Sequence, residues 1–487
     1  MEIKDPLIHY RDPERSREAL RRLGHDSVEV MLEYLYQEAM RRPIAPHTYA
    51  EFRKIFNVSG SAPLEGRPAG DILEEVRKRI LPNAMNAHHP RAFCYFTAPP
   101  LMMAVMGDLI ASAINQCVDV WVTGPAAAFA EEEVVRWMGD LVGYGPEAFG
   151  ILTSGGMNAN LTALKMARDH RIPDRHADGA LRRSRLYASE QTHFSVRRCL
   201  DVIGFPPESL RLVPCDGHFR MKVDELERAI EEDRKAGLCP FCVVANAGTT
   251  NTGAIDPLEE IARVGEERGL WRHADAAYGG AACLSERHRG RVRGLAAYDS
   301  VTLDPHKWMF QPHDIGAVLA KRRDDLLESF RSSPEYYRTG QPHEEPLHWY
   351  QFGIEGSRRF RGLKLWMSWK HLGTRGLGEL VDRNMEVAGY LAGRIRDSED
   401  FEAQPPEPDL SVVCFRHRPG GIAEGPALDA HQDRLQRALE VSGEAWVSTT
   451  RLRGATYLRA GVVNYLSEPA DAEALLDALR RLASERS

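Results

Sequence analysis

The residues most able to do chemistry lie where short apolar runs of the chain end. The run SVTLDPHK ends in His306 and Lys307, and LWRHAD ends in Asp275. SRLYAS is followed within a few residues by His193, and FGILTS leads into a Gly-Gly pair at 155–156. If these runs are parallel strands of one sheet, their ends meet at one edge, where ligands of such sheets bind. An amine, a carboxylate, imidazoles and a glycine turn would then share one site.

These groups predict a site for pyridoxal phosphate, because they are the parts that this cofactor requires. A lysine amine bonds covalently to it, and a carboxylate keeps its pyridine nitrogen protonated so that the ring accepts electrons. Glycines before a helix let free N–H groups approach the phosphate. An aromatic face such as His193 would stack on the ring, and Ala277 would leave room on the other face. Thr249 and Thr250 follow a further strand, FCVVANAG, at the same predicted edge.

The elements that position these groups alternate along the chain. From Phe149 onward, short apolar strands alternate with helices, as where FGILTS is followed by GGMNANLTALKMARDH. This alternation is typical of an α/β fold with a mostly parallel sheet and crossover helices. Asp224 and Asp256 are expected to cap two of these helices, since Pro257 suits a first helical position.

The length of the chain, 487 residues, predicts more than one domain, because single cores stop growing at roughly 250 to 300 residues. We expect an N-terminal helical arm over 1–88, with helices near Ser27 and Asp71 and little core of its own. Our hypothesis is that this arm packs on a partner subunit. A large cofactor-binding domain would cover 89–374, and a small α+β domain with strands such as DLSVVCFRH would cover 375–487.

Composition and charge argue against several other classes of protein. With 43% hydrophobic and 27% charged residues, the chain is typical of globular proteins and unlike disordered ones. A net charge of -7 without a long basic run argues against nucleic acid as a partner. There is no basic, apolar leader and no apolar run of the roughly 18 residues that a membrane span needs. We therefore expect a cytoplasmic protein that does not bind membranes.

The cysteines predict neither a disulfide framework nor a metal site. Eight of them are scattered along a large chain, which favours reduced thiols. Cys239 and Cys242 form the one close pair, but a zinc site needs about four ligands and no second pair accompanies them. We interpret both thiols as the start of a buried strand and predict no metal.

Four segments together resemble one family of enzymes. SGGMNANLTAL, ASEQTHFSV, HADAAYGG and SVTLDPHKW are similar to the group II pyridoxal-phosphate decarboxylases, and most of all to the aromatic L-amino acid branch. HPRAFCYFTAPP and GSRRFRGLKLW extend the resemblance over nearly the whole chain. The resemblance implies fold type I, the fold of aspartate aminotransferase, with a seven-stranded sheet. It also implies a homodimer that decarboxylates an L-amino acid to an amine.

The resemblance implies roles for five residues around the cofactor ring. Lys307 would bond covalently to the cofactor, and Asp275 would pair with the pyridinium nitrogen. His193 would stack over the ring, with Ala277 on the opposite face and Thr250 nearby. The matched motifs carry these roles position by position.

The resemblance places the cofactor phosphate at the glycine turn. Backbone and side chain around Gly155, Gly156 and Met157 would hold it, with help from His306. Members of the family often carry a hydroxyl residue where this chain has Met157. One side-chain contact to the phosphate would therefore be absent.

The outcome of the reaction depends on a further group. In the family, a loop after the lysine carries a tyrosine that returns a proton to the carbon that has lost carbon dioxide. Tyr336 falls at the matching place, 29 residues after Lys307 (336 minus 307), and a one-residue shift would give the role to Tyr337. Relatives with phenylalanine there react with oxygen and give an aldehyde, so Tyr336 favours the amine. Two alternatives stay open: decarboxylation-dependent oxidative deamination to an aldehyde, and a non-catalytic protein that kept the fold.

The resemblance also indicates which residues surround the substrate side chain. Tyr95, Phe96 and Thr97 match the substrate loop of the family, and an aromatic wall suits an aromatic or bulky side chain. The alternative is that these rings belong to the core. Asp119 stands where the aromatic branch places an apolar aromatic residue, with Trp121 two positions on. A carboxylate there would favour a hydroxylated or cationic substrate, unless Asp119 pairs with an arginine.

Overall fold

The computed structural model describes residues 12–38, 40–56, 58–332 and 347–485. The chain forms two compact units. The larger unit consists of Phe96–Arg416 and Arg459–Tyr465. The other unit contains the described parts of Met1–Tyr95, His417–Leu458 and Leu466–Ser487.

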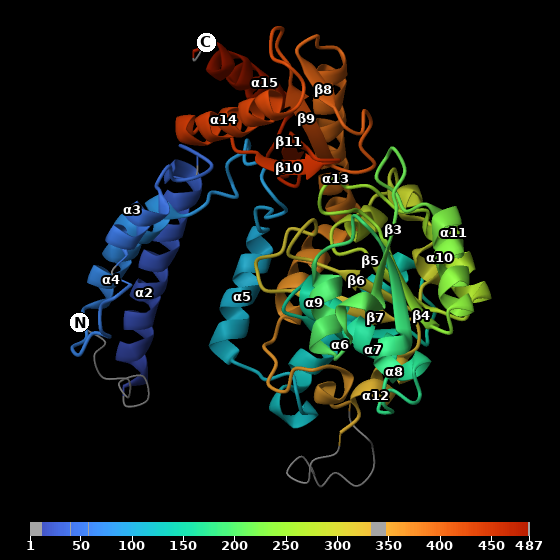
Figure 1. The fold of residues 1–487 in the computed structure, drawn as a ribbon. Helices are drawn as coiled ribbons and strands as arrows, with labels where there is room; N and C mark the ends of the chain where they lie inside the picture. Colours follow the sequence, from blue (N-terminus) through green and yellow to red (C-terminus); the bar gives the residue numbers. More distant parts are fainter. Residues whose placement is uncertain (1–11, 39, 57, 333–346, 486–487) are drawn as a thin grey trace. The chain divides into compact units, whose positions relative to one another are not determined.

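A seven-stranded sheet forms the centre of the larger unit (Figure 1). Its spatial order is β1-β7-β6-β5-β4-β2-β3, and β7 runs antiparallel to both of its neighbours. The other pairs, β6 with β5, β5 with β4, β4 with β2 and β2 with β3, are parallel. The predicted α/β architecture with a mostly parallel sheet is confirmed. The strands are β1 (Phe149–Thr153), β2 (Ser184–Ser189), β3 (Leu210–Val213), β4 (Cys239–Asn246), β5 (Trp271–Asp275), β6 (Ser300–Leu303) and β7 (Gly316–Ala320).

The register of the central strands aligns the ends that carry polar residues. Asn246 of β4 lies opposite Asp275 of β5, and Asp275 lies opposite Thr302 of β6. Because these strands are parallel, the segments that follow them leave the sheet at the same edge. The sheet thereby brings residues from distant parts of the sequence to one place.

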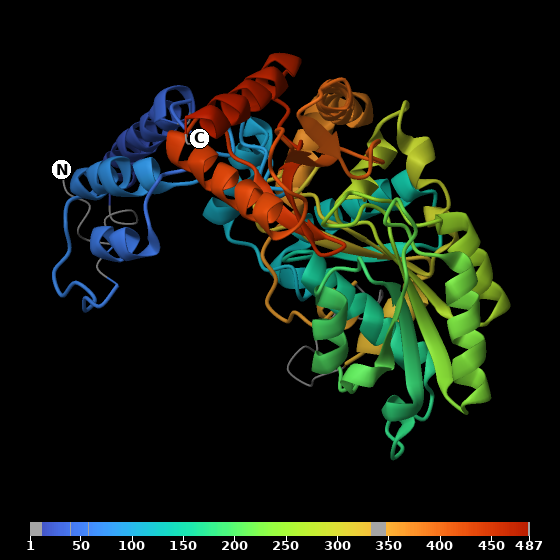
Figure 2. The ribbon, with the colours of Figure 1, turned by 45° about the horizontal axis from the view of Figure 1, so that its top comes forward.

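Helices of the larger unit cover the sheet and connect its strands. Helix α7 packs against β1 and β4 to β7 through small and apolar residues such as Ala159 and Ala163, which are fully buried. Helices α10 and α11 contact β4 and lie beside each other along the sheet (Figure 2). The helices are α5 (Met102–Ile114), α6 (Pro125–Val142), α7 (Gly156–Arg171), α8 (Ala180–Arg183), α9 (Ser195–Val202), α10 (Val223–Lys235), α11 (Leu258–Glu267), α12 (Arg323–Phe330) and α13 (Gly362–Arg396).

The other unit contains the helices expected near Ser27 and Asp71, which are α2 and α4. Its helices are α2 (Pro13–Glu33), α3 (Tyr49–Ile55), α4 (Ala69–Glu75), α14 (Pro426–Ser442) and α15 (Pro469–Ser484). A second sheet has the order β10-β11-β9-β8 and is not confined to this unit, because β8 and residues 412–416 of β9 belong to the larger one. Its strands are β8 (Phe401–Ala403), β9 (Val412–His417), β10 (Ser448–Leu452) and β11 (Ala455–Gly461). No helix in the described parts of the chain is long and apolar enough to cross a membrane.

The two helix caps predicted from the sequence are wrong. Helix α10 begins at Val223 with Lys222 as its cap, and α11 begins at Leu258 with Pro257 as its cap. The Asp256 carboxylate instead accepts hydrogen bonds from the N–H of Met221 (2.7 Å) and from the backbone and side chain of Asn246 (2.7 and 2.8 Å). These tertiary partners draw the carboxylate away from the helix. Burial raises its pKa to about 6.

The described cysteines carry free thiols, and no disulfide joins any two of them. Cys239 is exposed at the first position of β4, whereas Cys242 is fully buried further along the strand. The two residues belong to one strand, as interpreted, but only the second is buried. Among the described residues, no group of three or more metal-ligating side chains gathers in one place.

The buried ring of His273 makes stability depend on pH. It is fully buried in β5, and burial lowers its pKa to about 4. The same side chain has a pKa of about 6.5 in an unfolded chain, so the folded state binds fewer protons below that pH. The stability that the neutral ring contributes is therefore present above about pH 6.5 and is lost as the pH falls toward 4. We expect this group alone to lower the free energy of unfolding by about 2 kcal/mol between roughly pH 7.5 and pH 5.

Urea unfolding at the two pH values measures this effect, with the variant His273→Gln as the comparison. The variant should show a pH-dependent drop that is smaller by about the same 2 kcal/mol. An equal drop in both proteins would assign the acid sensitivity to other groups.

Candidate active site

The carboxyl ends of the central strands and the start of α7 surround one cavity of about 360 Å³. The residues predicted to bind the cofactor that line it are Gly155, Gly156, Met157, His193, Thr250, Asp275, Ala277, His306 and Lys307. Its other lining residues are Ser154, Asn158, Asn160, Asn246, Gly248, Tyr278 and Asp304. The structure thus brings residues from five separate segments of the chain to one place.

Lys307 lies on the turn that follows β6. Its backbone N–H donates to the carbonyl oxygen of Asp304 over 2.9 Å. Its Nζ lies 3.0 Å from Oδ2 of Asp304, and 24% of the side chain is exposed. The same Nζ lies 5.9 Å from the centre of the Phe96 ring. An ion pair therefore holds the amine at the cavity wall while leaving it accessible.

Asp304 is a site residue that the sequence analysis treated only as part of a turn. Its carboxylate is buried beside two glycines whose missing side chains make room for it. A Cβ atom at Gly156 would lie 2.6 Å from Oδ2, and one at Gly316 would lie 2.7 Å from Oδ1. Oδ1 has no hydrogen-bond partner among the described residues. The sequence could have indicated this role, because Asp304 stands three positions before Lys307 and the two side chains therefore share one turn.

Asp275 ends β5, and its carboxylate is held from two sides. Oδ1 accepts the N–H of Ala277 at 3.2 Å, and Oδ2 accepts Nδ2 of Asn160 at 2.9 Å. The sequence analysis did not identify Asn160, although it is a polar residue on the face of α7 that packs on the sheet. Two donors fix the orientation of the carboxylate at the cavity wall. Such a carboxylate suits a protonated pyridine nitrogen.

His193 lies in the segment between β2 and α9. Its Nδ1 lies 2.8 Å from Oγ of Ser195 and accepts the backbone N–H of Ser195 at 3.3 Å. Burial lowers the pKa of His193, although the carboxylate of Asp275 opposes this shift. The neutral ring is therefore favoured near pH 7, and a neutral imidazole can stack on an aromatic ring.

The start of α7 fits an anionic group such as phosphate. Gly155 precedes the helix, and none of the described side chains caps its first turn. A side chain at Gly155 would meet Cε1 of His306 at 3.2 Å, so the glycine keeps this approach open. His306 donates from Nδ1 to the carbonyl oxygen of Ile315, and burial lowers its pKa. Backbone N–H groups at a helix start bind anions. Together with Lys307, Asp275 and His193, this turn fits pyridoxal phosphate.

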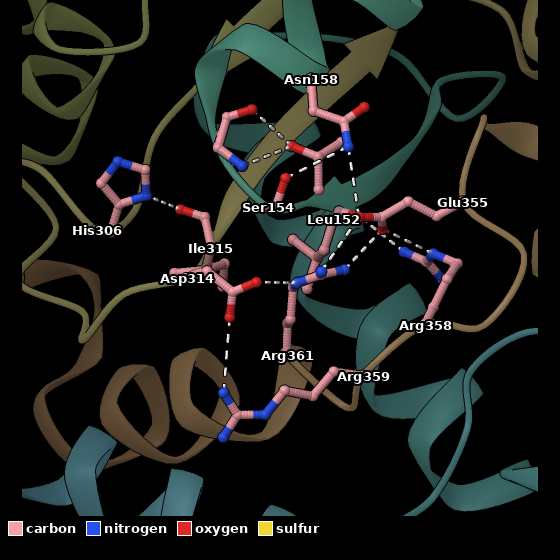
Figure 3. A network of polar contacts seen from close by, with 12 residues as sticks. Leu152, Ser154, Asn158, His306, Asp314, Ile315, Glu355, Arg358, Arg359 and Arg361 are labelled. Carbon is pink, nitrogen blue, oxygen red and sulfur yellow. Dashed lines mark hydrogen bonds and ion pairs between the residues drawn. The ribbon is translucent and has the colours of Figure 1, made fainter. Parts of the chain in front are cut away.

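A network of arginines and carboxylates supports this end of the cavity (Figure 3). Nδ2 of Asn158 lies 3.4 Å from Glu355, and Arg361 donates to Glu355 at 2.7 Å and to Asp314 at 3.1 Å. Arg358 donates to the carbonyl oxygen of Leu152 at 2.6 Å. These contacts connect the cavity wall to the segment before α13. Part of this segment, GSRRFRGLKLW, belongs to the family resemblance, but the sequence does not predict the network.

The predicted substrate residues are not among those that line the cavity. Phe96 contacts the wall of the cavity, because the centre of its ring lies 4.2 Å from the ring centre of Tyr278, and Tyr278 lines the cavity. Thr97 is half-buried, and Tyr95 is 60% exposed with its ring edge toward Trp446.

A buried arginine also contacts Phe96. The guanidinium of Arg459 lies 4.7 Å from the centre of the Phe96 ring. Its Nε donates to the carbonyl oxygens of Thr250 and Asn251, each at 3.0 Å. Arg459 was not predicted as a site residue, although a charged residue inside the apolar strand TYLRAGVV could have indicated it.

The carboxylate of Asp119 is held by hydrogen-bond donors of its own turn. Its Oδ1 accepts the Thr123 hydroxyl at 2.7 Å and the N–H of Val120 at 2.6 Å. Burial raises its pKa, but these hydrogen bonds outweigh burial and the pKa is lowered. Trp121 packs against the apolar core of the larger unit. Tyr336 and Tyr337 lie outside the described residues.

Comparisons with known proteins point to one family of enzymes. Residues 53–418 match the family model described as the pyridoxal-dependent decarboxylase conserved domain. An aromatic-L-amino-acid decarboxylase of Bacillus atrophaeus is 32% identical over 97% of this chain and 97% of its own length. A phenylacetaldehyde synthase of Petunia hybrida is 28% identical over 91% of this chain and 90% of its own. The crystal structure of Oryza sativa TDC with PLP and tryptamine superposes with a TM-score of 0.89 and 27% identity, covering 96% of this chain and 98% of that one.

Proposed function

Because the chain belongs to the family of pyridoxal-dependent decarboxylases and is a pyridoxal-phosphate-dependent amino acid decarboxylase of fold type I, we propose that its substrate is an aromatic or bulky L-amino acid. The product is the amine, released with carbon dioxide. One observation carries this proposal: the cavity that the lysine, carboxylate, imidazole and glycine turn line is also lined by Tyr278, whose ring lies against that of Phe96. The similarity to the Bacillus atrophaeus aromatic-L-amino-acid decarboxylase supports the aromatic class.

The proposal gives five of the cavity residues a task. When bound, pyridoxal phosphate supplies an electron-accepting ring that stabilises the charge left on the substrate carbon as carbon dioxide departs. Lys307 holds the cofactor covalently, and Asp275 keeps its ring nitrogen protonated. His193 covers one face of the ring and Ala277 leaves room on the other. The turn at Gly155 holds the phosphate with N–H groups of α7.

The substrate side chain is proposed to lie against an aromatic wall. The neighbouring rings of Phe96 and Tyr278, tilted at 31° to each other, support this, because aromatic faces favour aromatic partners. Thr97 and Trp121 are proposed to flank this wall. Asp119 is proposed to shape the turn that it caps, since its carboxylate already has donors from Val120 and Thr123.

A panel of L-amino acids tests the proposed substrate class. The cofactor-loaded protein is incubated under air, and carbon dioxide, amine, aldehyde and peroxide are measured together. Carbon dioxide with equal amine from tyrosine, phenylalanine, tryptophan or their hydroxylated forms is the expected result. Equal or faster turnover of diamino acids would instead assign a cationic side chain to the site. Aldehyde with peroxide would establish the oxidative reaction.

The second candidate is the oxidative reaction, which the similarity to a phenylacetaldehyde synthase favours. The resemblance of the loop makes Tyr336 the residue that decides between the two. Proton return by a positioned acid is worth about 10² to 10⁴ in rate. We expect Tyr336→Phe to lower amine formation by roughly 10²-fold or more and to raise aldehyde and peroxide.

Tyr337→Phe is the matched control for this variant, since it removes the same hydroxyl one position away. It should keep amine formation close to that of the original protein. If Tyr337→Phe loses the amine and Tyr336→Phe keeps it, the two residues exchange roles. Full amine output from both variants would remove the loop tyrosines from the mechanism.

The proposal includes a homodimer in the cytoplasm with an arm over 1–88, a large domain over 89–374 and a small domain over 375–487.

Exposed apolar side chains support an interface on the larger unit. Leu109, Ile110 and Ile114 of α5 are 44 to 59% exposed, and Phe129 of α6 is 58% exposed. The arm likewise exposes Leu64 at 96%. Sedimentation at micromolar concentration should give twice the 54.7 kDa mass of the chain.

A further inference from the structure

Asn160 makes an unusually complete set of hydrogen bonds inside the larger unit. Its side chain is 1% exposed. Nδ2 donates to Oδ2 of Asp275 at 2.9 Å and to Oγ of Ser195 at 3.0 Å. Oδ1 accepts the Thr302 hydroxyl at 2.7 Å and Nε2 of His273 at 3.1 Å. One amide of α7 therefore joins side chains from β5, β6 and α9.

The direction of these hydrogen bonds is fixed by the chemistry of the partners. A carboxylate only accepts, so the NH₂ group of Asn160 must face Asp275. Ser195 then accepts from Asn160 and has its own hydrogen to donate to Nδ1 of His193, 2.8 Å away. The backbone N–H of Ser195 also points to Nδ1, and a backbone N–H can only donate. Nδ1 of His193 is therefore an acceptor, and a neutral ring carries its hydrogen on Nε2.

We propose that Asn160 is a positioning residue that holds the Asp275 carboxylate toward the cofactor ring nitrogen and, through Ser195, sets which nitrogen of His193 carries the hydrogen. The inference deepens the proposed function, since it rests on the roles given there to Asp275 and His193. The side chain of Asn160 thereby orients both Asp275, at the ring nitrogen, and His193, over the face of the ring.

The proposal has two separate consequences. Without the donor from Asn160, the N–H of Ala277 alone holds the Asp275 carboxylate, which is then free to turn away from the ring nitrogen and stabilises its protonated form less well. Cofactor binding weakens as well, because a hydrogen bond to a charged group is lost. Losing the Ser195 hydroxyl leaves only the longer backbone contact of 3.3 Å to hold Nδ1 of His193 as an acceptor, so the other tautomer gains population.

Three variants test the proposal in the cofactor-loaded protein without substrate. Asn160→Leu removes the amide at similar volume, and Ser195→Ala removes the hydroxyl. Thr302→Val is the matched control, because it removes a hydrogen bond to Oδ1 of the same buried amide and leaves both Nδ2 bonds in place. The readouts are the ¹⁵N NMR shift of the ring nitrogen of labelled cofactor, the ¹⁵N shifts of His193 and the dissociation constant of pyridoxal phosphate.

In Asn160→Leu, we expect the ring nitrogen to move toward its unprotonated shift and the cofactor to bind about tenfold to a hundredfold more weakly. In Ser195→Ala, His193 should gain a population with hydrogen on Nδ1. Thr302→Val should keep both signatures of the original protein, even where its melting temperature falls.

Equal ring-nitrogen shifts in Asn160→Leu and Thr302→Val would overturn the proposal, because Asn160 would then act only through packing. An unchanged His193 tautomer in Ser195→Ala would overturn the second part, and this test remains open even if Asn160→Leu does not fold. These results are separate from the proposed function. A protein with a protonated ring nitrogen that produces no amine would contradict the proposed function and leave the positioning role in place.

Discussion

Replacing Lys307 by alanine is expected to abolish the yellow absorbance of lysine-bound cofactor and to lower the rate of amine formation by at least about 10⁴-fold. The reason is that we propose this amine as the covalent link to pyridoxal phosphate, and removing a nucleophile that acts with its partners costs rate factors of this size. Absorbance of the purified protein and release of carbon dioxide measure the two effects. The cavity itself should persist, because Lys307 keeps part of its side chain in solvent.

Lys321→Ala is the control for this variant, since Lys321 is an exposed lysine directly after β7. It should keep both the absorbance and the rate. Borohydride reduction followed by peptide mass analysis locates the bond independently of activity. A cofactor mass on any other lysine, or full absorbance in Lys307→Ala, would refute the assignment.

The second large effect is expected from Asp275→Asn. The amide keeps the shape of the side chain but cannot stabilise a protonated ring nitrogen, so the ring accepts electrons poorly. We expect the rate to fall by about 10² to 10³-fold, the loss typical when one fixed electrostatic partner is removed from an active site. The cofactor should still bond to Lys307, so that absorbance remains while turnover is lost.

Asp233→Asn is the matched control, because Asp233 is a similarly buried carboxylate that accepts from the Tyr187 hydroxyl at 2.7 Å and pairs with Arg211 at 2.6 Å. It should lower the melting temperature and leave the rate per bound cofactor unchanged. If both variants lose rate equally, general destabilisation explains the effect. If Asp275→Asn keeps its rate, another group protonates the ring.

The sequence predicted the sheet and most of the cavity because two simple signals agreed. Apolar runs of strand length alternated with helices, and polar residues followed the carboxyl end of each run. A parallel sheet places such ends together regardless of their separation in sequence. Lys307 and Asp275 could be found in this way because an amine and a carboxylate stand out after apolar strands.

The sequence did not reveal residues whose partners come from elsewhere in the fold. Asp256 has the local pattern of a helix cap, yet Met221 and Asn246 supply the donors that hold it. Asn160 has an ordinary place in a helix, and only the packing of α7 on the sheet gives it four partners. Asp304 precedes a proline and therefore indicated a turn, while the glycines that make room for its carboxylate lie at the starts of α7 and β7.

The substrate side was the least predictable part. Phe96 contacts a ring of the cavity wall, but Tyr95 belongs to the other compact unit. Asp119 suggested a charge for the substrate, whereas its carboxylate is satisfied within its own turn. A single sequence shows that a residue is acidic, but it does not show which donors surround it.

Strand β7, which runs antiparallel between β1 and β6, sets the order in which the site can form during synthesis. The strand pairs with β1 through residues up to Ala320, so β1 has no place in the sheet until that part of the chain exists. A nascent chain that ends earlier can hold Lys307 but cannot bring the turn after β1 to it. The cofactor is therefore a ligand of the finished sheet, and its binding stabilises only chains that have completed this late pairing.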